Sequence, residues 1–169
     1  TVDDAPATTD RQADELVVTP AKALRKDANF TAVVTYGGAP TAVPDPSAPG
    51  TIGWLTAASG SYVAAEPVGA KGFLPCNDHP SDKATFTFTL TAPSTETVIA
   101  NGVLAKKEAA GTQTTWTYDM PDEMATYLVQ IAVGNYEVVE STGPHGLPLR
   151  DAIVPTVTAE QRAVLADTA

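Results

Sequence analysis

Residues 85–91 read Thr-Phe-Thr-Phe-Thr-Leu-Thr, a strict alternation of polar and apolar side chains. Because successive side chains of a strand point to opposite faces, Phe86, Phe88 and Leu90 are predicted on one face and the threonines on the other. One apolar face and one polar face are typical of an antiparallel strand that is buried on a single side. The stretch therefore predicts a half-buried strand.

Shorter apolar segments on both sides of this stretch extend the β pattern, and 14 prolines and 12 glycines punctuate the chain. Thr, Val and aromatic residues, which suit a pleated sheet, are spread along its whole length. Short strands between such breakers predict an all-β fold, an antiparallel β-sandwich. The further predicted strands are residues 15–19, 30–36, 52–55, 61–65, 98–100, 103–105, 114–118, 127–133 and 136–140.

Breakers in the second half of the chain predict where strands end. Asn101-Gly102 predicts a tight hairpin, because Asn-Gly readily adopts the positive φ angles of a type I′ turn. Residues 106–111 predict a second turn, and the Pro-Asp-Glu sequence at residues 121–123 predicts the end of a strand. Each of these segments is therefore expected to separate two strands.

Only the C-terminal segment has a helical pattern. Residues 159–167 contain neither glycine nor proline, and Thr158 stands immediately before them. Gln161 follows Thr158 at the spacing of a capping box, in which each residue satisfies a backbone amide of the other. The sequence therefore predicts a short C-terminal helix.

Composition limits the classes of function. The chain has 169 residues, 43% of them hydrophobic, which is the size and core content of one ordinary domain. A net charge of −10 argues against binding to nucleic acid. One cysteine excludes an internal disulfide, and no apolar run approaches the ~20 residues of a membrane span. Low charge and few cysteines favour a bacterial protein that is secreted or held at the cell surface over a cytoplasmic one.

Few residues could carry chemistry on their own. The two histidines, His79 and His145, lie far apart, and no His-Glu-x-x-His motif is present. Cys76, Asp78 and His79 could be imagined as metal ligands, but a proline-bounded turn with a buried thiol is the simpler interpretation. No cation stands beside Cys76 to lower its pKa. Without further information, the residues predict a β-domain with no catalytic and no metal site.

Residues 73–86 read Phe-Leu-Pro-Cys-Asn-Asp-His-Pro-Ser-Asp-Lys-Ala-Thr-Phe. They resemble a signature of the aminopeptidase N family of zinc metallopeptidases (gluzincin aminopeptidases), in whose N-terminal domain Phe-Pro-Cys-x-Asp-x-Pro precedes Lys-Ala-x-Phe. Val-Ile-Ala-Asn-Gly at residues 98–102 is similar to a second family motif. Residues 124–134, which include Met-Ala-Thr-Tyr-Leu-Val and Ala-Val-Gly, are similar to a third. The resemblance covers residues 15–155.

The resemblance implies a saddle-like N-terminal β-sandwich beside a helical catalytic domain. Residues 1–155 would form this sandwich without its first strands, and residues 156–169 would be a connector and the start of a helix leading toward an absent catalytic domain. Removal of N-terminal residues from peptides would use zinc held in that catalytic domain. The resemblance therefore implies that this chain by itself is inactive.

One substrate-binding residue is implied by the resemblance. In the family, a Glu or Gln ten positions before the motif cysteine binds the free α-ammonium group of the substrate, and Glu66 stands ten positions before Cys76. Ala64 occupies a position where the family often has Gln, and His79 one where Glu is common. The expected partners are therefore the peptide N-terminus, contacted by Glu66, and the parent's catalytic domain.

Other interpretations stay open at the level of sequence. A non-catalytic β-sandwich that binds carbohydrate or a protein partner would share the fold, as would a structural spacer domain. Because the resemblance implies missing first strands, we also expect an exposed sheet edge, through which two copies of the chain would dimerise.

Overall fold

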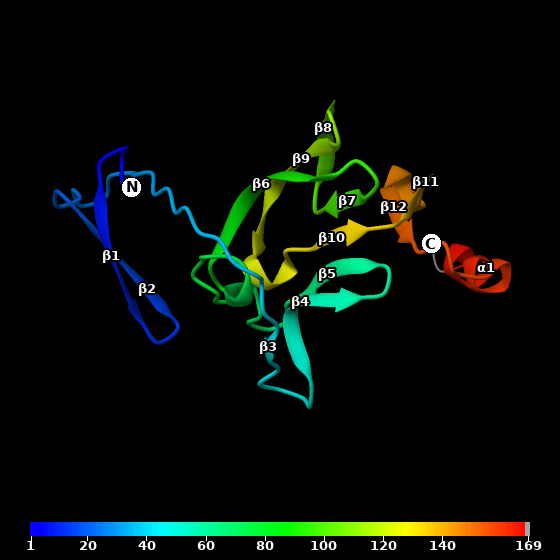
Figure 1. Cartoon of the computed structure of the whole chain (residues 1–169), viewed down its shortest axis with the longest axis horizontal. Coiled ribbons are helices and arrows are strands. Elements are labelled where there is room, and N and C mark those ends of the chain that lie inside the picture. Colours follow the sequence, from blue (N-terminus) through cyan, green and yellow to red (C-terminus); the bar gives the residue numbers. More distant parts are fainter. Residues whose placement is uncertain (168–169) are drawn as a thin grey trace.

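The computed structural model describes residues 1–167, and strands dominate it (Figure 1). The strands are β1 (Ala7–Gln12), β2 (Glu15–Pro20), β3 (Val43–Pro44), β4 (Thr51–Ala57), β5 (Gly60–Ala64), β6 (Lys83–Pro93), β7 (Thr97–Ala100), β8 (Val103–Ala110), β9 (Gln113–Ala125), β10 (Ile131–Gly134), β11 (Glu137–Thr142) and β12 (Pro148–Ile153). The helical elements are the 3-10 turns η1 (Ala70–Gly72), η2 (Thr126–Leu128) and η3 (Pro144–Gly146), and helix α1 (Ala159–Asp167).

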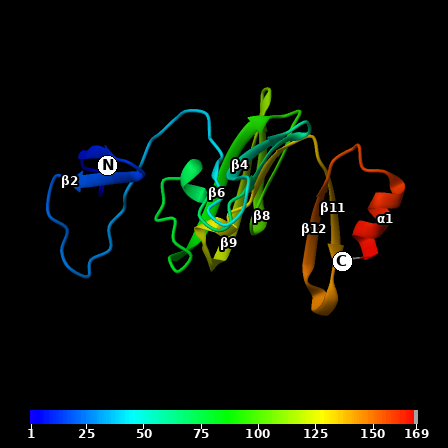
Figure 2. The ribbon, with the colours of Figure 1, turned by 90° about the horizontal axis from the view of Figure 1, so that it is seen from below.

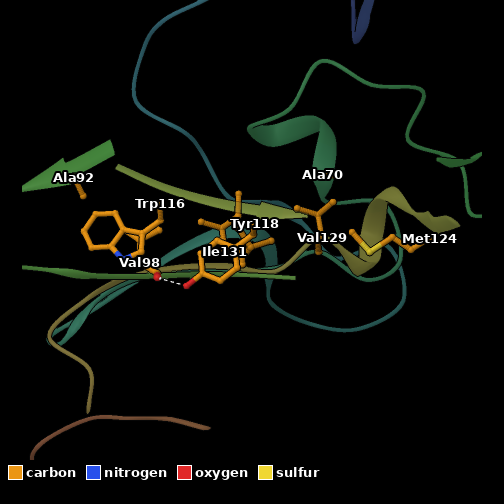
Figure 3. Close-up of a cluster of buried hydrophobic side chains, with 11 residues drawn as sticks. Ala70, Ala92, Val98, Trp116, Tyr118, Met124, Val129 and Ile131 are labelled. Carbon is orange, nitrogen blue, oxygen red and sulfur yellow. Dashed lines mark hydrogen bonds between the residues drawn. The ribbon is translucent and has the colours of Figure 1, made fainter. Parts of the chain in front are cut away.

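Two antiparallel sheets share one hydrophobic core. One sheet has the order β3-β4-β5-β10-β7 and the other the order β6-β9-β8. Side chains from both sheets meet in the core, among them Val98, Trp116, Tyr118 and Ile131 (Figure 3). The buried hydroxyl of Tyr118 donates a hydrogen bond of 2.8 Å to the Val98 carbonyl, which joins the two sheets. The predicted antiparallel β-sandwich is confirmed.

The side chains of β6 alternate between the core and the surface, as predicted. Phe86, Phe88 and Leu90 pack against the core, whereas the threonines between them are exposed. On the outer face, the Thr91 hydroxyl lies 2.8 Å from the Thr115 hydroxyl on the neighbouring β9. Such cross-strand pairs stabilise a sheet without needing burial.

The predicted hairpin at Asn101-Gly102 is wrong, because the two flanking strands belong to different sheets. β7 pairs with β10, and β8 pairs with β9, so the chain crosses between the sheets at these residues. Gly102 has φ +84°, and a Cβ at this position would collide with the Asp119 carbonyl oxygen. The glycine is required by this close approach as well as by its backbone conformation.

Gly102→Ala is expected to lower the free energy of unfolding by more than about 2 kcal/mol, because the β9 backbone would have to move. Gly111→Ala is the matched control: Gly111 also has a positive φ, +61°, but nothing lies within 4 Å of the position that a Cβ would take there. Its substitution should cost only about 1 kcal/mol. The free energies of unfolding are measured by urea denaturation. If both variants lose the same amount, the close approach of Gly102 to the Asp119 carbonyl is not important for stability.

Three more sequence predictions are corrected in β8, β9 and β10. Residues 106–110 form the end of β8 instead of a turn, which is confined to residues 111–112. β9 continues through residues 121–123, because its pairing with β6 shifts between Ala84 and Phe86, where a proline is tolerated. Residues 127–133 are divided between η2 and β10 and do not form one strand.

The N-terminal part of the chain forms an outlying ribbon (Figure 2). β1 and β2 pair only with each other among the described residues, and the polar sequence of β1 does not predict a strand. The predicted strand at residues 30–36 is wrong, because only Ala32 makes a bridge, to Val2, and Phe30 and Tyr36 are 54% and 62% exposed. An apolar segment becomes a strand only beside a partner. Dimerisation through an exposed edge stays a prediction.

The C-terminal hairpin β11–β12 and helix α1 lie at the opposite end of the molecule (Figures 1 and 2). The predicted helix is confirmed with its capping box, since the Thr158 amide donates to Gln161 Oε1 and the Gln161 amide to Thr158 Oγ1. Arg150 of β12 holds the hairpin to the sandwich by donating to the Ala100 and Gly102 carbonyls. Among residues 1–167, no helix is long and apolar enough to cross a membrane.

Candidate functional site

Glu66 lies in the turn that connects β5 to η1. Its neighbour Ala65 is 3% exposed and accepts a hydrogen bond of 2.7 Å from the Gly69 amide, which closes the turn. Gly69 in turn packs on Gly53 of β4 so closely that a Cβ on Gly69 would lie 2.8 Å from the Gly53 nitrogen. The backbone around Glu66 is therefore fixed by the sheet, whereas its own side chain is exposed.

The Glu66 side chain lines an open hollow of about 310 Å³. One wall comes from β4, β5 and the turn after β5, and the other from η2 and the residues that follow it. Within the described part of the chain, Glu66 is the only charged residue that lines this hollow. The lining residues are Ile52, Val63, Ala64, Ala65, Glu66, Tyr127, Leu128, Val129 and Gln130. The hollow thus combines one carboxylate with mainly apolar walls.

Asp78 connects η1, which follows the first wall of the hollow in the chain, to η2, which begins the second. Its Oδ2 accepts a hydrogen bond of 3.0 Å from the Lys71 amide in η1, and its Oδ1 accepts one of 2.7 Å from the Thr126 hydroxyl in η2. Both carboxylate oxygens therefore have a partner, and they hold η1 next to η2. Asp78, one of the two acidic residues in the 73–86 motif, therefore has a structural role here.

Cys76 packs against the core and is half-buried. Burial, followed by the nearby negative charge of Asp78, raises the pKa of the Cys76 thiol to about 11. The thiol is therefore protonated at neutral pH, and it lacks the thiolate form that nucleophilic attack requires.

The imagined metal ligands Cys76, Asp78 and His79 do not converge. Asp78 faces Lys71 and Thr126, and His79 Nδ1 lies 2.8 Å from the Ser81 hydroxyl. In residues 1–167, no three His, Cys, Asp or Glu side chains come together in a group that could hold a metal ion. The donor set of the described chain does not fit zinc.

The two tryptophans give no support to a carbohydrate-binding interpretation. Trp116 is 3% exposed, and Trp54 is half-buried with its ring centroid 5.8 Å from that of Phe73. Sugar-binding surfaces of this kind depend on exposed aromatic platforms, and neither tryptophan provides one.

The second wall of the hollow, residues 127–130, is not predicted by the sequence. Tyr-Leu-Val is a short apolar run that predicts a strand, and periodicity cannot separate such a run from a turn. The Asn101 side chain is hydrogen-bonded to the Leu128 carbonyl and the Gln130 amide of this wall, yet its Asn-Gly context in the sequence is that of a hairpin turn. The Asn-Gly dipeptide is the only local signal, and it indicates the wrong structure.

Comparisons with known proteins agree with this architecture. A family model of the Peptidase M1 N-terminal domain matches residues 61–128. Human glutamyl aminopeptidase is 36% identical over 93 residues, which are 53% of this chain and 10% of the relative. Leucyl aminopeptidase of Saccharolobus solfataricus is 31% identical over 74 residues, or 44% of this chain and 9% of the relative. The chain spans about a tenth of the length of these relatives.

Solved structures extend the similarity to almost the whole chain. A mutant of a two-domain M1 zinc metallopeptidase bound to L-arginine matches with a TM-score of 0.85 at 30% identity, covering 94% of this chain and 38% of that one. The M1 zinc metallopeptidase from Deinococcus radiodurans matches with a TM-score of 0.81 at 28% identity, covering 94% of this chain and 37% of that one. Legionella pneumophila aminopeptidase A, at 19% identity and a TM-score of 0.68, shares the fold.

Proposed function

Because the chain belongs to the Peptidase M1 N-terminal domain family, we propose that it is the substrate-recognition domain of a zinc metallo-aminopeptidase. In this proposal Glu66 binds the free α-ammonium group of a peptide. The observation that carries it is the position of Glu66, which is the one carboxylate among the described residues at the rim of a mainly apolar hollow.

The chemistry of exopeptidases favours this role for Glu66. An enzyme that removes one N-terminal residue must distinguish a terminal amine from an internal peptide bond. A carboxylate does so by a charge-assisted hydrogen bond to the ammonium group, which an acylated nitrogen cannot form. The Ala65–Gly69 hydrogen bond of 2.7 Å and the contact with Gly53 hold the backbone of Glu66 in place for this contact.

An exposed carboxylate alone binds an ammonium group weakly, since water competes with the contact. We infer that a catalytic domain covers the hollow in the complete enzyme and removes this water. Residues 1–155 would then be the recognition domain, and residues 156–169 the connector toward the catalytic domain. A zinc ion in that domain would supply the activation of water for hydrolysis.

The 169-residue chain is expected to release no nitroaniline from leucine p-nitroanilide, with or without added zinc, because its described donor set does not fit a zinc ion. The longer enzyme that contains the chain is expected to hydrolyse the same substrate. Hydrolysis by the purified chain, or its absence from the longer enzyme with zinc bound, would contradict the proposed function.

A further inference from the structure

Asn101 makes two side-chain hydrogen bonds to one backbone segment. Its Nδ2 donates a bond of 3.1 Å to the Leu128 carbonyl, and its Oδ1 accepts one of 2.6 Å from the Gln130 amide. The two bonds enclose Val129. An amide side chain offers a donor and an acceptor side by side. The Asn101 side chain therefore binds residues 128–130 by the same pair of backbone hydrogen bonds that a neighbouring strand would make.

The segment that Asn101 holds is the second wall of the Glu66 hollow. Val129 points into the core and is 2% exposed, whereas Leu128 is 47% exposed, and all three residues 128–130 line the hollow. An exposed leucine at such a place leaves apolar surface uncovered in the hollow. The position of this surface depends on the two bonds from Asn101.

Asn101 is itself held firmly. It follows β7, whose last residue Ala100 pairs with Ile131 of β10. On either side of Asn101, the Ala100 and Gly102 carbonyls accept hydrogen bonds of 2.7 and 3.2 Å from the Arg150 guanidinium group. Because the backbone is fixed on both sides of Asn101, its side chain can hold residues 128–130 in a defined position.

We propose that Asn101 is a positioning residue that sets the shape of the hollow beside Glu66, and that this hollow receives an uncharged, apolar side chain from the first residue of the peptide. The proposal rests on the proposed function of Glu66. The described lining side chains are mainly apolar, and the single charge among them, on Glu66, is assigned to the α-ammonium group. An acidic first residue would meet this carboxylate without a compensating cation, and a basic one would compete with the α-ammonium group for it.

The test compares Asn101→Ala with wild type in the longer enzyme that contains the chain. The substrates are the p-nitroanilides of leucine, alanine and glutamate, together with N-acetyl-leucine p-nitroanilide. Wild type should prefer leucine to alanine by at least about tenfold in kcat/KM, as an apolar pocket does for added methylene groups. Asn101→Ala should remove most of this preference by raising KM for leucine, with a smaller effect on kcat.

Asn135→Ala is the matched control. Asn135 follows β10 at the end opposite to Gln130, is exposed and does not line the hollow. It should leave the substrate preference unchanged. If Asn101→Ala does not fold, Asn101→Asp takes its place, because it keeps the acceptor for the Gln130 amide and loses the donor to the Leu128 carbonyl.

Two results would overturn the proposal. One is an Asn101 variant that lowers kcat/KM equally for leucine, alanine and glutamate, since this would indicate a purely structural role. The other is a wild-type enzyme that prefers the glutamate substrate. Failure of the proposed function is seen separately, as hydrolysis of the N-acetylated substrate at a rate similar to that of the free amine.

Discussion

Glu66→Gln should lower kcat/KM for leucine p-nitroanilide by at least about 30-fold in the longer aminopeptidase of which we propose this chain is a part. The substitution keeps the size of the side chain and removes its charge. Loss of one partner from a desolvated charge pair costs about 2–5 kcal/mol, and each 1.4 kcal/mol corresponds to about a factor of ten. Much of the loss should appear in KM, because the ammonium contact is present before the reaction as well as during it.

Glu123→Gln is the control for this substitution. Glu123 is an exposed glutamate near the end of β9 and does not line the hollow, so the same chemical change there should leave kcat/KM unaltered. An unchanged specificity constant in Glu66→Gln, or an equal loss in both variants, would contradict the assignment of Glu66.

Trp116→Ala should destabilise the domain strongly, lowering the free energy of unfolding by about 3–5 kcal/mol. The indole is 3% exposed and belongs to the core that both sheets share (Figure 3). Small domains have a free energy of unfolding of only about 5–15 kcal/mol, so the substitution should remove a large part of the stability of the domain. Urea denaturation of the 169-residue chain, followed by circular dichroism, measures this change.

Thr117→Ala is the comparison for Trp116→Ala. Thr117 is the next residue of β9 and is only half-buried, on the opposite face of the strand. Its truncation should cost no more than about 1 kcal/mol. Similar losses for the two variants would mean that the interface between the sheets does not depend on the Trp116 side chain.

The parts of the fold that could be predicted are those set by local pattern. Alternation in residues 85–91 fixes which side chains of β6 are buried, and the Thr158–Gln161 pair fixes the start of α1. Both depend on residues within one element, so the sequence contains the whole signal.

The strand and turn predictions that were wrong are those that depend on which distant segment a strand pairs with. Asn101-Gly102 has the local chemistry of a hairpin turn, but β7 and β8 pair with strands from elsewhere in the chain and the turn becomes a crossover. Residues 30–36 have the pattern of a strand, but among the described residues their backbone pairs only with the short segment of residues 1–3, through a single bridge between Ala32 and Val2. Pairing between distant segments leaves no trace in local periodicity.

The candidate site was predictable only in part. The family resemblance pointed to Glu66, while its own neighbours in sequence, Ala65 and Pro67, give no sign of a role. The opposite wall, residues 127–130, is bound by Asn101, and Thr126 just before it is bound by Asp78, so that two further segments hold it in place. Such an assembly of four distant segments becomes visible only in three dimensions.

The most direct measurement is a crystal structure of the longer enzyme, with L-leucine bound beside this domain. Our account predicts the leucine nitrogen within hydrogen-bond distance of a Glu66 carboxylate oxygen, about 2.7–3.2 Å, with the leucine side chain in the hollow against Leu128. A bound leucine whose nitrogen contacts other residues, with the Glu66 side chain directed into solvent, would contradict it.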